Sequence, residues 1–260
     1  MSRLAKIRKL KRTRVIKTRQ CILDLIKKRT ASKSQELIID FTTTACVRPW
    51  VLDATYKSYS TNLKGIDFKK CTLYINVDPI GNTSQYSAED VVAVAEKYFK
   101  EVVANTPDKA NFALASKWCL TQPTREYFFH LEDDWELVRE VNIQDMLSMF
   151  KENTLQVVLN KGKNQTLLRE TGEPMFVPSL IKTKHMKYYT EVMEDSGNPE
   201  QRVKQRYRRN KRNKPPSSIF FNIKLPYSVD RGRRWLRQHK FARDRRNIGN
   251  AGWQTWRKTK

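Results

Sequence analysis

Residues 128–137 read FFHLEDDWEL, and this stretch decides how the rest of the chain is interpreted. A short apolar run, typical of a buried strand, ends in three consecutive acidic residues, Glu132, Asp133 and Asp134. Adjacent carboxylates repel each other unless a positive group lies among them, and Mg²⁺ and Mn²⁺ prefer such oxygen ligands. The pattern therefore predicts a divalent cation at the mouth of a strand. The alternative is that the acids cap a helix formed by WELVREVNI.

Composition indicates a globular protein with one large core. The chain has 260 residues, 39% of them hydrophobic, which is enough for one core or one core with an appendage. It contains no apolar run approaching the ~20 residues that span a bilayer. Its four cysteines, Cys21, Cys46, Cys71 and Cys119, form no CxxC pair. We therefore expect neither a zinc site nor a disulfide framework, but a cytoplasmic protein.

Charge is distributed unevenly along the sequence. Residues 1–30 hold 12 Lys or Arg and one acid, and residues 201–260 hold 20 Lys or Arg and two acids. Of the 51 basic and 27 acidic residues, 19 and 24 remain for residues 31–200, a balance of −5. A slightly acidic core thus lies between two strongly basic flanks. Flanks this basic favour a polyanionic partner, nucleic acid first and an anionic membrane surface second.

Strand and helix patterns alternate through the core. Short apolar runs predict four strands, at 37–41, 72–77, 126–135 and 154–162. Helical spacing predicts three helices, one opened by Pro49 and the others at 87–105 and 111–122. We read 42–45 as a polar loop. This alternation is typical of an α/β fold with a mixed, mostly parallel sheet and helices on both faces.

Polar residues follow three of the predicted strands. They are the loop 42–48, Asp78 after the second strand, and the acids at 132–134. Ligands of open α/β sheets bind beyond the carboxyl ends of the strands. We therefore expect one site that contains all three groups.

The motifs TTTACVRPWVLDATYKS (42–58), YINVDP (74–79), NFALASKW (111–118) and LEDDW (131–135), in this order, resemble those of GT-A-type, family 2-like nucleotide-sugar glycosyltransferases. The resemblance covers about residues 36–235 and implies a GT-A-like Rossmann-type sheet. It implies a UDP-sugar donor and Mn²⁺ or Mg²⁺, with Asp134 as the metal ligand. The donor-binding residues that it implies are Thr43, Ala45, Arg48, Asp78, Asn111, Lys117, Glu132, Asp133 and Arg233.

The same resemblance implies an acidic base that deprotonates the acceptor hydroxyl, with inversion at the sugar. Glu200 in NPEQRVKQR matches that position best, and Asp195 and Asp230 remain candidates. For Glu200, a plain role in the first turn of a helix is an equal alternative. The stretch DRGRRW (230–235) fits either the donor pyrophosphate or a nucleic acid.

Basic and aromatic residues near the carboxyl end predict contacts with double-stranded DNA. The candidates are Arg206, Arg208, Arg209, Lys211, Arg212, Trp235, Arg237 and Trp253. A glycosyltransferase with such flanks resembles phage enzymes that glycosylate a hydroxymethylated pyrimidine of DNA, a base that must be flipped out to react. If the protein is phage-encoded, it is expected in the cytoplasm of the host cell.

We expect three parts: a basic helical extension at 1–35, a catalytic domain at 36–235 and a basic aromatic tail at 236–260. Within the catalytic domain, 202–214 is expected to be too charged to pack, and to form a loop or a helix extension. Two alternatives remain open. One is a glycosyltransferase of the cytoplasmic membrane face that acts on a lipid-linked or surface glycan. The other is a nucleic-acid-binding protein without catalysis.

Overall fold

The computed structural model describes residues 37–159, 172–194, 197–221, 226–238, 241–243 and 256–258. The chain divides into two compact units, residues 1–37 and 38–260, and nearly all described residues belong to the second. The predicted extension at 1–35, Asp195 and Trp253 lie outside the described residues. No described helix is long and apolar enough to cross a membrane.

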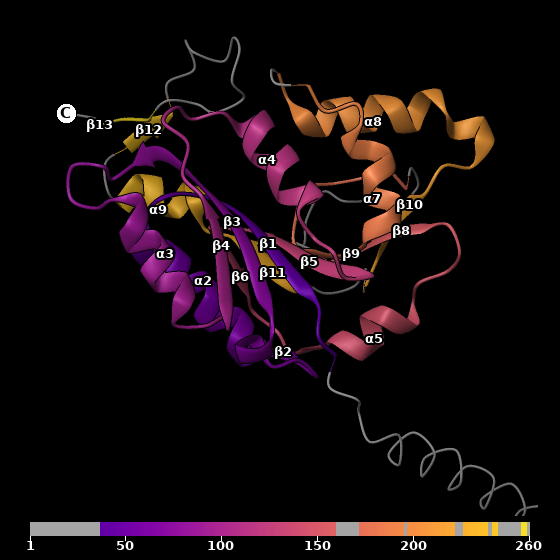
Figure 1. Ribbon diagram of the computed structural model, residues 1–260, viewed down its shortest axis with the longest axis horizontal. Coiled ribbons are helices and arrows are strands. Elements are labelled where there is room, and N and C mark those ends of the chain that lie inside the picture. The colour runs from indigo at the N-terminus through magenta and orange to yellow at the C-terminus, as the bar shows by residue number, and fades with distance from the viewer. Residues whose placement is uncertain are drawn as a thin grey trace, which may run out of the picture. The chain divides into compact units, whose positions relative to one another are not determined.

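A seven-stranded mixed sheet forms the centre of the second unit (Figure 1), in the order β10-β8-β9-β5-β1-β3-β4. Its strands are β1 (Asp40–Val47), β3 (Thr72–Gly81), β4 (Glu101–Asn105), β5 (Tyr127–Glu132), β8 (Thr154–Val158), β9 (Ser179–Lys182) and β10 (Ser217–Phe220). Within this seven-stranded sheet, only β9 runs antiparallel to its neighbours, β5 and β8. This sheet, flanked by helices, confirms the predicted α/β class.

Helices cover both faces of the sheet. They are α2 (Pro49–Asn62), α3 (Ala88–Glu96), α4 (Phe112–Thr121), α5 (Ile143–Ser148), α7 (Thr183–Thr190), α8 (Pro199–Arg209) and α9 (Gly232–Gln238), with 3₁₀ turns η1 (Phe68–Lys70) and η2 (Lys211–Asn213). Short pairs complete the fold: β2 (Leu63–Lys64) with β7 (Val141–Asn142), β6 (Trp135–Leu137) with β11 (Ser228–Asp230), and β12 (Phe241–Arg243) with β13 (Trp256–Lys258). The helix α9 crosses the predicted boundary at residue 235.

The two faces of the sheet bury different side chains. On one face, Tyr56 of α2 donates a hydrogen bond to Thr43 of β1 at 3.1 Å. On the other, the ring of Trp118 in α4 lies 6.5 Å from that of Tyr74 in β3. Because side chains alternate along a strand, Asp78 shares the α4 face with Tyr74. The donor-side polar groups of β3 therefore point away from α2.

Two predicted boundaries are wrong. Residues 101–105, read as the end of a helix, form the edge strand β4, because α3 ends at Glu96 and the β-branched pair Val102–Val103 suits a strand. Residues 42–45, read as a loop, lie inside β1 and are buried. Their polar side chains tolerate burial because they are hydrogen-bonded: Thr42, for example, lies 2.9 Å from Nδ1 of His130.

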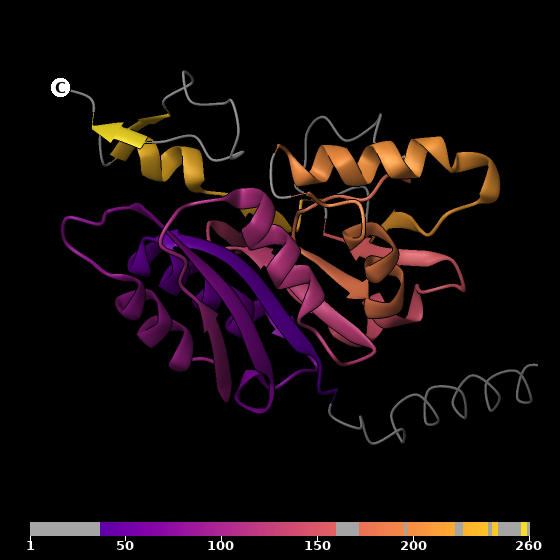
Figure 2. The ribbon, with the colours of Figure 1, turned by 45° about the horizontal axis from the view of Figure 1, so that its top comes forward.

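The basic segment 202–214 packs against the core, contrary to the prediction. Helix α8 begins after Asn198, whose side chain accepts a hydrogen bond from the Gln201 N–H at 3.2 Å, and Pro199 occupies its first turn. Val203 and Tyr207 face inward and join an apolar cluster with residues of α4 and α7. Figure 2 shows α7 and α8 side by side. Cations on one face and two apolar anchors on the other allow the helix to pack.

Candidate active site

The acidic stretch Glu132–Asp134 forms a turn between two strands, not a helix cap. Glu132 ends β5, and Trp135 begins β6, which pairs with β11. The alternative of a helix starting at Trp135 is therefore wrong. Since β11 ends at Asp230, opposite Trp135, the turn also lies beside the predicted DRGRRW stretch.

Asp133 is buried and holds the turn in place. Its Oδ2 accepts hydrogen bonds from the Cys46 N–H at 3.1 Å and from Nε of Arg48 at 2.9 Å, and its Oδ1 accepts from Nη2 of Arg48. Its backbone carbonyl accepts from Oγ1 of Thr55 at 2.7 Å. With every carboxylate oxygen occupied by protein donors, Asp133 serves the architecture of the site.

Arg48, one of the predicted donor-binding residues, is buried against the acidic turn. It is 1% exposed, and its guanidinium also lies 3.3 Å from Oδ2 of Asp134. Burial disfavours its charge, yet Asp133 and Asp134 raise its pKa above the ordinary value. The indole ring of Trp235 lies beneath it, 5.3 Å from the guanidinium carbon. In this structure Arg48 orients two carboxylates.

Asp134 and Asp230 meet across Gly232. The Gly232 N–H donates to Oδ1 of Asp230 at 2.9 Å, and the Arg231 N–H donates to the carbonyl of Asp134 at 2.7 Å. A side chain at Gly232 would overlap Oδ2 of Asp134 and lie 3.4 Å from Oδ1 of Asp230. Burial raises the pKa of Asp134 to about 6, opposed by Arg48 and reinforced by Asp133 and Asp230.

This pair could accept a divalent cation. Gly232 brings the carboxylates of Asp134 and Asp230 close to the same point of the backbone. Such a pair suits a hard cation that keeps water and phosphate as its other ligands. Within the described ranges, no group of three or more His, Cys, Asp or Glu is close enough to form a metal site alone. Asp134 and Asp230 would therefore hold the cation only together with other oxygen donors.

Glu200 lies on the other side of the acidic turn. Burial, together with the charges of Asp134 and Glu200, raises the pKa of Glu132, while a hydrogen bond from Nε1 of Trp135 at 2.7 Å opposes the rise. Glu200 in the first turn of α8 pairs with Lys204 at 2.5 Å. The charges of two predicted base candidates thus act on the turn, that of Glu200 on Glu132 and that of Asp230 on Asp134.

Asp78 and Asn111 meet on the α4 face of the sheet. Oδ1 of Asp78 accepts from Nδ2 of Asn76 at 2.7 Å, and its Oδ2 accepts from the Asn111 N–H at 3.0 Å. The Asn111 side chain in turn caps α4 by accepting from the N–H groups of Ala113 and Leu114. The predicted nucleotide-binding pair is therefore rigidly positioned.

The other predicted donor-binding residues are dispersed. Thr43 is buried and bonded to Tyr56, and Ala45 is fully buried on the same face. Lys117 is half-buried on α4. The side chain of Arg233 lies outside the described residues.

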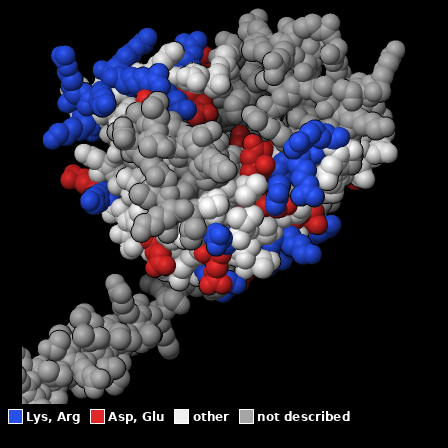
Figure 3. Space-filling view, turned by 180° about the vertical axis from the view of Figure 1, so that it is seen from behind, with Lys and Arg blue, Asp and Glu red and all other residues white. Residues whose placement is uncertain are grey.

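Among the predicted nucleic-acid contacts, Arg206 and Arg208 have acidic partners. Arg206 pairs with Glu191 at 3.0 Å, and Arg208 binds Glu173 through two nitrogens at 2.7 and 3.0 Å. Exposed cations without an ion pair to any described residue follow toward the end of the helix: Arg209, Lys211, Arg212 and Lys214. Figure 3 shows the molecule from behind, with Lys and Arg gathered at the upper left, where α8 lies in this view.

Trp235 is a correction to the predicted nucleic-acid surface. It is 4% exposed because it packs beneath Arg48 and against Trp50, 6.1 Å between ring centroids. Its ring is therefore not open to a base. Arg237, two residues further along α9, is exposed.

The sequence analysis did not identify the residues that contact the predicted acids. Lys204 follows the predicted acid Glu200 by four positions and pairs with it. Gly232 follows the predicted acid Asp230 by two positions. A glycine between charged residues in DRGRRW was a signal for close approach of another group. The predicted absence of a disulfide is consistent with Cys46, Cys71 and Cys119, which are buried free thiols.

No protein-family model and no curated protein matches this sequence. Solved structures match its fold. Mannosyltransferase PcManGT from Pyrobaculum calidifontis, in complex with GDP-Man and Mn²⁺, aligns at 11% identity with a TM-score of 0.50, over 71% of this chain and 55% of its own. S. aureus TarS aligns at 11% identity and 0.50, over 74% of this chain and 36% of its own.

A second TarS structure, of residues 1–349, aligns at 8% identity with a TM-score of 0.51, over 74% of this chain and 60% of its own. The chain thus spans between 36% and 60% of the length of these structures. At such identities the likeness concerns the fold. The mixed α/β sheet of this chain, flanked by helices, is similar to the fold of these glycosyltransferases.

Proposed function

We propose that this protein is a metal-dependent glycosyltransferase. It transfers a hexose or pentose from a UDP-sugar, with inversion, to a hydroxymethylated pyrimidine in DNA. The observation that carries the proposal is the convergence of carboxylates from three distant segments: Glu132 to Asp134 after β5, Asp230 after β11, and Glu200 at the start of α8. On a fold shared with glycosyltransferases, such a cluster suits a diphosphate leaving group.

The donor nucleotide would bind on the α4 face of the sheet. Asp78 is a buried carboxylate held by Asn76 and by the Asn111 N–H, so its orientation is fixed. A carboxylate in that place suits the N3–H of uracil or a ribose hydroxyl. The PcManGT complex contains GDP-Man, so the choice of UDP over GDP rests on the sequence resemblance and needs its own test.

Asp134 and Asp230 would hold Mn²⁺ or Mg²⁺ beside the diphosphate. The cation supplies Lewis-acid neutralisation of the negative charge that develops on the departing nucleotide. Arg48 pairs with both Asp133 and Asp134 and so offsets the repulsion between them, and Gly232 allows Oδ2 of Asp134 to approach the backbone closely.

Glu200 would act as the base. Its carboxylate takes the proton of the acceptor hydroxyl, the acceptor oxygen bonds to the anomeric carbon, and the bond from that carbon to the diphosphate oxygen breaks. Lys204, whose Nζ lies 2.5 Å from Oε1 of Glu200, would hold this carboxylate in position. The charge of Glu200 acts on Glu132, which supports its placement beside the acidic turn.

The acceptor proposal rests on charge. Arg209, Lys211, Arg212 and Lys214 form a cationic end to α8, and α8 carries Glu200 at its other end. A polyanion on this helix would thus approach the proposed base. A pyrimidine with a hydroxymethyl group supplies the nucleophile that an unmodified base lacks.

The donor half is tested by nucleotide binding and sugar release. We expect UDP to raise the unfolding temperature in Mn²⁺ more than in chelator, and more than GDP does, and a UDP-sugar to be hydrolysed slowly. Asp134→Asn should abolish both effects, whereas Asp145→Asn, an exposed acid of α5, should retain them. Equal UDP stabilisation of the wild type with chelator would reject the metal.

The acceptor half is tested by mass spectrometry of nucleosides. DNA containing 5-hydroxymethylcytosine or 5-hydroxymethyluracil is incubated with protein, metal and the UDP-sugar that is hydrolysed. A hexosyl or pentosyl mass increment on the nucleoside, absent with Glu200→Gln, supports the proposal. Turnover of the donor with no DNA product would reject the DNA acceptor and favour a glycan acceptor.

A further inference from the structure

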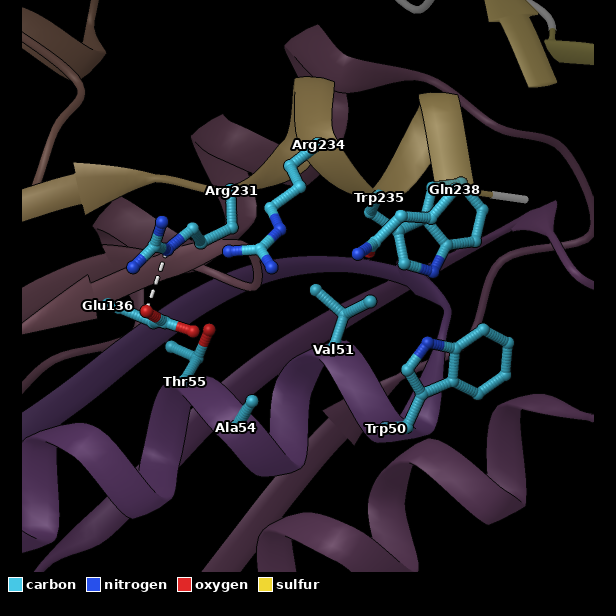
Figure 4. A pocket seen from close by; sticks show the side chains of 9 residues that line it. All are labelled: Trp50, Val51, Ala54, Thr55, Glu136, Arg231, Arg234, Trp235 and Gln238. Atoms are coloured by element: carbon cyan, nitrogen blue, oxygen red, sulfur yellow. Dashed lines mark hydrogen bonds and ion pairs between the residues drawn. The ribbon is translucent and has the colours of Figure 1, made fainter. Parts of the chain in front are cut away.

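The acidic turn and Asp78, the two parts of the proposed donor site, are held by different groups. The turn is held from the side of α2, where Thr55 donates to the carbonyl of Asp133 and the Arg231 N–H donates to that of Asp134. Figure 4 shows Thr55 and Arg231 among the residues that line a pocket between α2 and α9. Asp78 lies on the other face of the sheet, where side-chain amides reach it.

Asn76 and Asn105 form a hydrogen-bonded chain that ends on Asp78. The two asparagines lie opposite each other in β3 and β4, and residues two apart along β3 share a face of the sheet. Nδ2 of Asn105 donates to Oδ1 of Asn76 at 2.6 Å, and Nδ2 of Asn76 donates to Oδ1 of Asp78 at 2.7 Å. The Asn111 N–H holds the other oxygen of Asp78, at 3.0 Å.

The chain can run in only one direction. An ionised carboxylate accepts hydrogen bonds and donates none, so Asn76 must turn its NH₂ toward Asp78. Its carbonyl then points to β4, where it needs a donor because Asn76 is 1% exposed. Asn105, half-buried at the end of β4, supplies that donor. Reversing Asn76 would place its carbonyl against the carboxylate, and reversing Asn105 would place two carbonyls together.

The pairing of β3 with β4 does not depend on these amides alone. The two strands pair through their backbones from Glu101 to Asn105. A second side-chain link between them, from Oγ1 of Thr72 to Glu101 at 3.0 Å, is exposed and lies at the opposite end of β4. The link from Asn105 to Asn76 differs because it continues to a buried carboxylate. This difference indicates a role at Asp78.

We propose that Asn76 and Asn105 are positioning residues for the donor nucleotide. They set the plane of the Asp78 carboxylate, and so the direction from which it can accept a hydrogen bond from the nucleotide. Asn105 acts through Asn76, so a residue of the edge strand contributes to UDP affinity through a buried amide. This inference rests on the proposed nucleotide site at Asp78 and adds to it the residues that orient the carboxylate.

The first test is a double-mutant cycle on UDP affinity, measured by calorimetry in Mn²⁺. Asn76→Leu keeps the shape and removes a hydrogen bond to a charged group, so it should weaken UDP by about tenfold or more. Asn105→Leu should weaken it by about three- to tenfold, because Asn76 then loses its donor. The double variant should bind like Asn76→Leu alone, since the effect of Asn105 passes through Asn76.

The control breaks the other link between the same strands. Thr72→Val removes the hydrogen bond to Glu101 and should leave UDP affinity unchanged. Equal UDP affinity of Asn105→Leu and the wild type overturns the proposal. A loss from Asn105→Leu that persists in full in the Asn76→Leu background also overturns it, because Asn105 would then act without Asn76.

The second test needs no nucleotide. In protein labelled with [4-¹³C]aspartate, with the Asp78 resonance assigned by Asp78→Asn, both Asn76→Leu and Asn105→Leu should shift the Asp78 carboxyl resonance, and Thr72→Val should not. A wild type that binds no UDP would reject the proposed nucleotide site, and this resonance would then decide the inference by itself. If the Asp78 resonance is the same in Asn105→Leu and the wild type, Asn105 does not position Asp78 and the inference fails.

Discussion

Two groups of arginine–carboxylate pairs in this molecule have the same chemistry in different surroundings. At the acidic turn, Arg48 and Asp133 are both buried, with side chains 2% and 3% exposed. Between α7 and α8, Arg206 pairs with Glu191 and Arg202 with Glu194, and the glutamates are 66% and 59% exposed. The first group fixes a geometry, and the second remains accessible to salt and to other anions.

The contrast explains which cations can meet a ligand. Arg48 cannot leave Asp133 without leaving a buried charge unpaired, so it orients the site. A surface pair costs little to open, so Arg202 and Arg206 can exchange a carboxylate for a phosphate. Position in the fold, more than residue type, separates the positioning arginines from the binding ones.

The largest expected effect comes from breaking the buried pair. Arg48→Met leaves Asp133 uncompensated and should lower the free energy of unfolding by about 3–5 kcal/mol, measured by urea denaturation. The matched control on the surface, Arg202→Met, should cost at most about 1 kcal/mol. Adding Asp133→Leu to Arg48→Met should recover part of the loss. Equal losses for Arg48→Met and Arg202→Met would refute the distinction between the two groups.

His130 is a buried titratable group without an ion pair to any described residue, and it extends the comparison to pH dependence. His130 lies 2.9 Å from Oγ1 of Thr42, and burial lowers its pKa from 6.5 to about 4. The unfolded chain therefore binds a proton first as pH falls. Above pH 6.5 the titration of His130 does not affect the free energy of unfolding. As the pH falls from 6.5 to 4, that free energy decreases by about 3 kcal/mol in total. His130→Gln should remove this part of the pH dependence of the unfolding free energy. A variant with the same pH slope as the wild type would contradict this reading.

Much of the fold was predictable because its signals are local. The apolar runs of β3 and β5, Pro49 at the start of α2 and the capping box of Ser87 and Asp90 in α3 all specify structure within a few residues. Residues 101–105 misled us, because their apolar spacing also fits a helix and only pairing with β3 makes them a strand. The threonines of β1 are polar, and their burial depends on partners from distant segments, His130 and Tyr56.

The acidic residues of the candidate site could be predicted from the sequence, whereas the contacts between them could not. Three carboxylates after an apolar run are visible in one dimension, as is Asp78. No local pattern distinguishes Arg48, which is buried, from the many arginines that are not. The approach of Glu200 to Glu132 and of Asp230 to Asp134 depends on how α8 and β11 pack, which is long-range information.

Asp78 gives an effect of intermediate size. It is a buried carboxylate that accepts hydrogen bonds from amide groups of Asn76 and Asn111, whereas Asp133 pairs with Arg48. Asp78→Ala should weaken UDP by about 1–3 kcal/mol, the range for a lost hydrogen bond to a charged group. Calorimetry in Mn²⁺ measures this, with circular dichroism to verify the fold. Unchanged UDP affinity would remove Asp78 from the nucleotide site.

The smallest effect on stability is expected from the surface cations, and it is the one that distinguishes paired from open charges in DNA binding. Each phosphate contact contributes about −0.9 to the slope of log affinity against log salt. Changing Arg209, Lys211 and Arg212 to Ser should flatten the slope by roughly two to three such contacts. Arg202→Ser with Arg206→Ser should flatten it less, because Glu194 and Glu191 already compete for these cations.

The reverse change provides the matched experiment. Glu191→Gln with Glu194→Gln frees Arg206 and Arg202 and removes two negative charges, so DNA affinity at low salt should rise and the slope should steepen. The unfolding free energy should change by at most about 1 kcal/mol, since the pairs are exposed. Fluorescence anisotropy of labelled duplex at several salt concentrations measures the slope. If the slope is the same for these variants and the wild type, DNA does not lie along α8, and the cations there serve α8's own packing.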